Sequence, residues 1–125
     1  MEPEKKRILL VEDEPDFRMA LRLRLEANGY EVLEAVDGAE GLEIARSQKV
    51  DLLVLDVMLP KMDGYKVARF LKFDEKYRRI PIIMLTARSQ KTDRDTGLSV
   101  GADAYITKPF KPEELIETMT KLLKV

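Results

Sequence analysis

The chain has 125 residues, of which 45% are hydrophobic and 36% charged, a composition typical of a folded globular domain and not of a disordered or fibrous chain. Its 22 lysines and arginines nearly balance its 23 aspartates and glutamates. The resulting net charge of -1 indicates neither a nucleic acid nor an anionic membrane as a partner. It has no cysteine and no histidine, which excludes disulfides, thiol catalysis and a histidine base. Its chemistry must therefore rest on carboxylates, lysines and hydroxyls.

The first seven residues are mostly charged, and the apolar run that follows them at 8–11 is too short for a signal peptide or a membrane span. We therefore expect a cytoplasmic chain without a membrane partner. Because no linker or low-complexity stretch interrupts the sequence, we expect one domain over residues 1–125.

Short apolar runs alternate with segments of helical periodicity along the whole chain. Apolar residues recur at helical spacing between the runs, as Phe17, Leu21 and Leu25 do at i, i+4 and i+8. A strand followed by a helix, five times over, predicts an α/β fold with a parallel sheet. The predicted strands lie at residues 8–11, 30–35, 52–55, 82–85 and 104–107.

Helix boundaries and strand composition refine this prediction. Pro15 and Pro112 suit the first positions of helices, and Gly29 suits the position just past a helix end. The first, third and fourth runs are apolar throughout, as central parallel strands are, whereas the second carries Glu31 and Glu34 and the fifth is short. We therefore predict a flavodoxin-like (βα)5 fold, with a five-stranded parallel sheet of order 2-1-3-4-5 and helices on both faces.

Polar residues follow four of the predicted strands where each one ends. In open α/β sheets, ligands bind beyond the carboxyl ends of the strands, near the point between strands one and three where the strand order reverses. One polar residue at a strand end is ordinarily just solvated, but five at matching ends of four strands indicate a site. Neighbouring strands are ~4.8 Å apart, so these side chains should converge on one pocket. They are Glu12, Asp13, Asp56, Thr86 and Lys108.

The residue types in this set indicate their chemistry. Three carboxylates packed together repel one another, and oxygen ligands without histidine or cysteine favour Mg²⁺ or Mn²⁺ over zinc. Lys108 and the Thr86 hydroxyl add a positive charge and a hydrogen-bond donor for an anionic group arriving at Asp56. Aspartate is a covalent phosphoryl acceptor, and a metal can bridge acceptor and phosphoryl oxygens, so we predict that this group is phosphoryl.

Four blocks of sequence, in order, resemble the response-regulator receiver domain, and the resemblance runs from about residue 6 to residue 125. The blocks are ILLVEDE at 8–14, DLLVLD at 51–56 followed by Met58, Pro60 and MDG at 62–64, IIMLTA at 82–87, and GADAYITKPF at 101–110.

The resemblance implies a role for each site residue. Asp56 would be the phosphoacceptor, Asp13 a direct Mg²⁺ ligand, Glu12 a ligand through water, and Met58 a ligand by its backbone carbonyl. Lys108 would pair with Asp56 or its phosphoryl group.

Further roles concern the switch and its lifetime. The resemblance makes Thr86 the partner of a phosphoryl oxygen and Tyr105 the aromatic switch residue. It also implies a cis peptide at Pro109, which would hold the preceding lysine toward the pocket. The side chains of Met58 and Arg88 would border the approach of the hydrolytic water, and an apolar residue at 58 favours a longer-lived phosphorylated state.

The function implied is a signalling switch and not a turnover enzyme. A sensor histidine kinase or phosphotransfer protein would supply the phosphoryl group from a phosphohistidine. The surface of the fourth helix, fifth strand and fifth helix would then change, acting on a downstream effector or output domain or forming a homodimer. The fourth helix, near residues 95–101, should be short or mobile because helix formers are few there.

Some features limit or compete with this interpretation. Receivers of the winged-helix transcription-factor subfamily usually have an arginine-rich last helix, whereas residues 115–124 contain no arginine, so we expect no direct nucleic acid binding by this domain. A phosphatase like the haloacid dehalogenases would have a second aspartate where Met58 stands. A flavin module would need a loop rich in glycine, serine or threonine where residues 12–15 are acidic. The chain is either a stand-alone receiver or part of a longer regulator.

Overall fold

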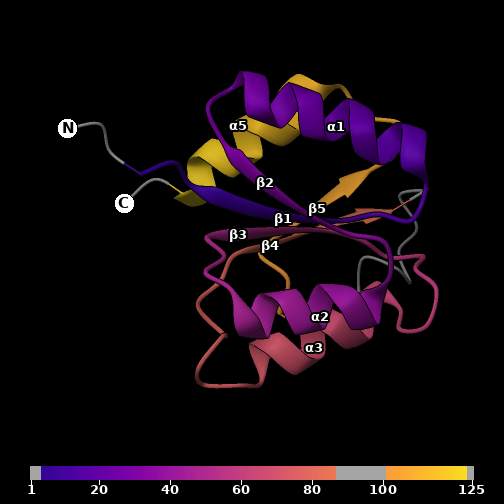
Figure 1. The fold of residues 1–125 in the computed structure, drawn as a ribbon, viewed down its shortest axis with the longest axis vertical. Helices are drawn as coiled ribbons and strands as arrows, with labels where there is room; N and C mark the ends of the chain where they lie inside the picture. Colours follow the sequence, from indigo (N-terminus) through magenta and orange to yellow (C-terminus); the bar gives the residue numbers. More distant parts are fainter. Residues whose placement is uncertain (1–3, 87–100, 124–125) are drawn as a thin grey trace.

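The structure is a computed structural model that describes residues 4–86 and 101–123 (Figure 1). One parallel sheet of five strands runs through its centre in the order β2-β1-β3-β4-β5, which confirms the predicted order. Strands β2 and β5 are its edges, as their mixed composition indicated. The strands are β1 (Arg7–Val11), β2 (Glu31–Ala35), β3 (Leu52–Asp56), β4 (Ile82–Thr86) and β5 (Ala104–Thr107).

Helices cover both faces of this sheet. In Figure 1, α1 and α5 lie on one face, and α2 and α3 lie on the other. The fourth helix, expected near residues 95–101, falls outside the described residues apart from Gly101. Among the described helices, none has the length and apolar character that crossing a membrane requires. The helices are α1 (Pro15–Ala27), α2 (Gly38–Ser47), α3 (Gly64–Lys72) and α5 (Pro112–Leu123).

The three central strands supply two separate hydrophobic cores. Successive side chains of a strand point to opposite faces, so Leu9 packs with residues of α2 and α3, whereas Leu10 packs with residues of α1 and α5. Every residue from Ile8 to Val11 and from Leu52 to Leu55 is buried completely. This explains why these runs are apolar without alternation.

Helix starts and ends follow local chemistry. Pro15 is the first residue of α1, and the Glu14 carboxylate before it accepts the N–H groups of Asp16 and Phe17 at 3.1 and 2.7 Å. At the other end, Asn28 caps α1 and Gly29 follows with a φ of 92°. Both predicted boundaries of α1 are therefore confirmed, and the Glu14 cap fixes the first turn of this helix close to the end of β1.

Gly64 allows α3 to begin directly beneath the end of β3. Its N–H donates to the carbonyl of Val57 at 3.0 Å. A Cβ atom at position 64 would lie 2.3 Å from the carbonyl oxygen of Asp56 and 2.9 Å from Cα of Val57. Because these are backbone atoms of the strand end, they cannot turn away, and the loop after Asp56 keeps this path only with glycine at 64.

We expect Gly64→Ala to lower the free energy of unfolding by about 3 kcal/mol, because the new methyl group overlaps a backbone that has no space to yield. Urea unfolding followed by circular dichroism measures this loss. Gly29→Ala is the matched control, since its Cβ would meet nothing within 4 Å. It should cost only the strain of a left-handed backbone, about 1 kcal/mol. Equal losses in the two variants would contradict this account.

Candidate functional site

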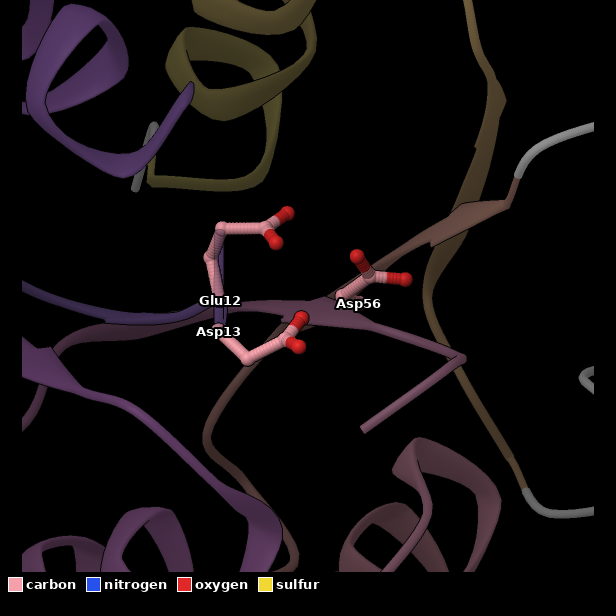
Figure 2. A group of neighbouring side chains, drawn as sticks. All are labelled: Glu12, Asp13 and Asp56. Carbon is pink, nitrogen blue, oxygen red and sulfur yellow. The ribbon is translucent and has the colours of Figure 1, made fainter. Parts of the chain in front are cut away.

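Three carboxylates meet at the carboxyl ends of β1 and β3. Val11 pairs with Leu55 in the sheet register, so Glu12 and Asp13 on one strand end lie beside Asp56 on the other. One oxygen from each of the three side chains lies within 4.8 Å of the others (Figure 2). Glu12 is 1% exposed and Asp56 is 5% exposed, whereas Asp13 reaches solvent. Burial and mutual repulsion both penalise these negative charges, so the group requires positive charge nearby.

Lys108, just after β5, supplies one such charge from inside the protein. Its Nζ lies 2.8 Å from Oδ2 of Asp56 and 3.2 Å from Oε1 of Glu12. Burial of the lysine lowers its pKa, but the hydrogen bonds and charges of Asp56 and Glu12 outweigh burial, and the pKa of Lys108 is raised above its ordinary value. Among the residues that the structure describes, one cation faces three acids, so these residues leave an excess of negative charge.

Glu12 responds most strongly to this environment. Burial, followed by the hydrogen bond to Asp56, raises the pKa of Glu12 from its ordinary 4.5 to about 7. The N–H of Glu14, which donates to Oε2 of Glu12 at 3.0 Å, acts in the opposite direction and favours the charged form. Near neutral pH, the Glu12 carboxyl is therefore close to half protonated, and a cation nearby would favour its charged form.

The other predicted residues lie around this group. The N–H of Met58 donates to Oδ1 of Asp56 at 3.0 Å, while the Met58 side chain is 73% exposed. Thr86 is buried as the last residue of β4, one position beyond the Leu85 that pairs with Asp56. Sequence periodicity placed the strand ends at 55 and 85, but pairing continues through Asp56 and Thr86 because backbone ladders accept a polar side chain.

Two further predicted positions lie on the described part of β5 and the loop after it. Tyr105 is half-buried, pairs with Met84 in the register, and packs against the core between the sheet and helices α2 and α3. The Lys108–Pro109 peptide bond is cis, which is the isomer that the resemblance implies. Arg88 lies outside the described residues.

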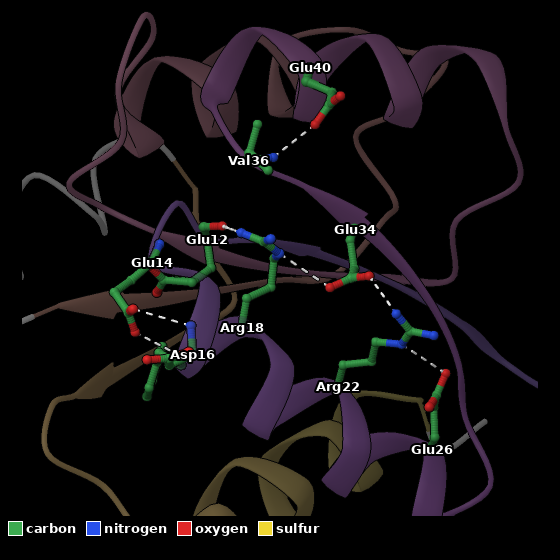
Figure 3. A network of polar contacts seen from close by, with 10 residues as sticks. Glu12, Glu14, Asp16, Arg18, Arg22, Glu26, Glu34, Val36 and Glu40 are labelled. Carbon is green, nitrogen blue, oxygen red and sulfur yellow. Dashed lines mark hydrogen bonds and ion pairs between the residues drawn. The ribbon is translucent and has the colours of Figure 1, made fainter.

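A layer of charged contacts behind the carboxylates was not anticipated from the sequence (Figure 3). Arg18 donates from Nη1 to the backbone carbonyl of Glu12 at 2.9 Å and from Nε to Glu34 at 3.2 Å. Arg22 holds the other oxygen of Glu34 at 2.8 Å. Arginines at i and i+4 on the helix that follows an acidic pair are the signal that could have indicated this support.

Phe17 is a second contact that the sequence did not reveal. Its helical spacing with Leu21 and Leu25 assigned it to the apolar face of α1, and those two leucines are indeed buried. Phe17 packs against the same core, as predicted, but its ring also lies beside the site, with its centroid 4.5 Å from Nζ of Lys108. Helix periodicity finds the apolar face but does not say which residue of another element lies opposite.

Residues 8–120 match the family described as the response regulator receiver domain. The chain belongs to this family. The receiver is 50% identical over 124 residues to a probable transcriptional regulator, ycf27, from Cyanophora paradoxa. That match covers 99% of the chain and 51% of the relative, so the receiver spans about half the length of the curated relatives it matches.

Solved structures of other receivers have the same fold. One is the receiver domain of a sensor histidine kinase from Pseudomonas aeruginosa with magnesium coordinated in its active site cleft, at 35% identity and a TM-score of 0.90 over 98% of this chain and 100% of that one. Another is the response regulator TrrA from Thermotoga maritima in complex with Mg²⁺-BeF, at 38% identity and a TM-score of 0.84 over 94% and 99% of the two chains.

The raised pKa of Glu12 predicts a dependence of stability on pH in metal-free receiver. The protonated Glu12 carboxyl favours the folded state. This contribution to the free energy of unfolding is fully present below the pKa of Glu12 in the unfolded chain, near 4.5, and is lost as the pH rises through the folded-state pKa of about 7. Wild type should therefore lose up to about 3 kcal/mol of this contribution between pH 5 and pH 8. Glu12→Gln cannot ionise and should be the more stable protein at pH 8 but not at pH 5.

Urea unfolding in EDTA at the two pH values measures this difference. Glu43→Gln is the control, because Glu43 is an exposed glutamate on α2 and its removal should leave the pH dependence of wild type intact. If wild type and Glu12→Gln change in parallel from pH 5 to pH 8, the burial of an ionisable Glu12 does not govern stability in this range.

Proposed function

We propose that this receiver is a phosphorylation-dependent signalling switch of a two-component system, in which Asp56 accepts a phosphoryl group in a Mg²⁺-dependent reaction. The observation that carries the proposal is the set of contacts around the Asp56 carboxylate. Lys108 contacts one of its oxygens and the N–H of Met58 the other, and two further carboxylates lie within 4.8 Å. A carboxylate in a purely structural role gains no stability from two more carboxylates beside it, because the like charges repel one another.

The donor set fits a hard divalent cation. Carboxylate and carbonyl oxygens suit Mg²⁺ or Mn²⁺, and the excess negative charge of the pocket favours a cation. Asp13 would be a direct ligand together with Asp56 and the backbone carbonyl of Met58, and Glu12 would bind through water. When bound, such an ion neutralises the carboxylates and stabilises the charge on the phosphoryl oxygens.

The protein's own groups have distinct parts in the transfer. An oxygen of Asp56 forms the new bond to phosphorus, while the bond from phosphorus to the nitrogen of the donor phosphohistidine breaks. Lys108 is close enough to follow the negative charge from the carboxylate to the phosphoryl group. Thr86, buried at the end of the neighbouring strand, would donate its hydroxyl to a phosphoryl oxygen.

The switch would run from Thr86 to the edge of the sheet. Phosphorylation adds negative charge and acceptor oxygens at Asp56, and movement of Thr86 toward them would change the space beside Tyr105. We propose that β5 and α5, with the fourth helix beyond the described residues, form the surface that changes. That surface would bind a downstream effector or output domain, or a second phosphorylated receiver.

The partners follow from this chemistry. A sensor histidine kinase or phosphotransfer protein is the proposed donor, because a phosphohistidine supplies a transferable phosphoryl group. The relative named above is a probable transcriptional regulator about twice the length of this chain. We propose that any control of transcription is exerted through an output domain or partner, since α5 lacks the arginines that would give it a basic face.

We expect acetyl phosphate to label wild-type receiver with one phosphoryl group in Mg²⁺ or Mn²⁺ but not in EDTA, because the anionic donor cannot approach the uncompensated carboxylates. Asp56→Asn should remain unlabelled. Asp74→Asn, a change at the loop after α3, should be labelled like wild type. Intact-mass spectrometry measures all four cases, and full labelling of Asp56→Asn or labelling in EDTA would refute the assignment.

The lifetime of the phosphorylated state should depend on the side chain at 58. Met58 is exposed beside Asp56 and cannot orient water, so Met58→Asn should speed dephosphorylation several-fold. The decay of the phosphorylated mass after removal of acetyl phosphate measures the rate. Met19→Asn, at another exposed methionine, on α1, controls for loss of a surface apolar group. An unchanged rate in Met58→Asn would show that residue 58 does not control hydrolysis.

A further inference from the structure

The ammonium group of Lys108 has an aromatic neighbour in addition to its two carboxylates. Nζ lies 4.5 Å from the centroid of the Phe17 ring, inside the range in which a cation is attracted to an aromatic face. The other neighbours of Nζ are Asp56 at 2.8 Å and Glu12 at 3.2 Å. Lys108 is therefore held by contacts from three elements: α1, the end of β1 and the end of β3.

The position of the Phe17 ring is itself fixed. Its backbone N–H donates to the capping carboxylate of Glu14 at 2.7 Å, which anchors the residue in the first turn of α1. Its ring meets that of Phe110 edge-on, with centroids 6.0 Å apart and planes at 77°. A shallow, mostly apolar hollow of about 380 Å³ is lined by Phe17, Lys108, Pro109 and Phe110. The aromatic pair thus links the start of α1 to the loop that carries Lys108.

We propose that Phe17 is a positioning residue for Lys108. An aromatic face attracts an ammonium but takes up none of its strong hydrogen bonds, whereas a third carboxylate or a water would compete for an N–H. The ring therefore orients the lysine and leaves its donors to Asp56, Glu12 and an arriving phosphoryl oxygen. The kinetic part of this inference rests on the proposed function, but the placement of the lysine against the ring does not.

Two substitutions separate the aromatic face from the bulk of the side chain. Phe17→Leu keeps an apolar group but removes the ring, and Phe17→Tyr keeps the ring. At saturating acetyl phosphate, Phe17→Leu should be phosphorylated about three- to ten-fold more slowly than wild type, as expected for loss of a partly buried cation–π contact. Phe17→Tyr should stay within about two-fold of wild type, because it keeps the aromatic ring. Mg²⁺ affinity measured by calorimetry should be the same in all three proteins, because the ligands are untouched.

A spectroscopic signature tests the placement without any phosphorylation. The ε-methylene group of Lys108 is bonded to Nζ, which lies 4.5 Å from the centroid of the Phe17 ring, so its protons should show a ring-current shift in the NMR spectrum. This shift should disappear in Phe17→Leu and persist in Phe17→Tyr. The shift reports that the ring lies beside the lysine, whereas the rates test positioning: if Phe17 acted only by filling space, Phe17→Leu would be phosphorylated as fast as wild type.

Phe73→Leu is the matched control, because Phe73 is 75% exposed just after α3 and is not among the residues that line the hollow beside Lys108. It should change neither the rate nor the Lys108 resonance. If folded Phe17→Leu is phosphorylated at the wild-type rate, or if its Lys108 resonance does not move, the inference is overturned while the proposed function stands. If wild type itself is not labelled at Asp56, the proposed function fails, and the NMR comparison then decides only whether the Phe17 ring lies against Lys108.

Discussion

The contact of one lysine with two buried carboxylates is the interaction on which the site depends. Lys108 bridges Asp56 and Glu12 across 52 and 96 positions of sequence, so it ties the last strand of the sheet to the first and the third. Without this charge, two acids with almost no exposure would face each other in a medium that penalises ionisation. With it, the part of the pocket that the structure describes still has more negative than positive charge, and that imbalance favours a divalent cation.

Support for the carboxylates also comes from the edge of the sheet. Glu34 belongs to edge strand β2 and faces α1, where Arg18 and Arg22 hold its two oxygens. Arg18 in turn contacts the backbone carbonyl of Glu12. Charged residues on an edge strand ordinarily serve to prevent pairing with other chains. Here one of them also holds the helix that Glu14 caps and whose first turn carries Phe17.

The sequence allowed the fold and the carboxylate cluster to be predicted because both depend on regular patterns. Apolar runs identify strands buried on two faces, and parallel strands bring their carboxyl ends to one edge, which places Asp13 near Asp56. The contacts of Glu12 with Lys108 and of Phe17 with Lys108 follow from where α1 and the loop after β5 settle on the sheet. Packing of whole elements decides those positions, and no local spacing encodes them.

The alternation of side chains in β1 and β3 has a consequence for how the site is assembled. Leu9 and Leu10 serve two different cores, so a slip of β1 by one residue against β3 would exchange the two faces and place every apolar side chain against the wrong helices. The same slip would carry Glu12 and Asp13 away from Asp56. Misregistered chains are therefore disfavoured by poor packing of both cores and by the burial of a charged residue from one end of β1. Residues that never touch the carboxylates thus set their alignment.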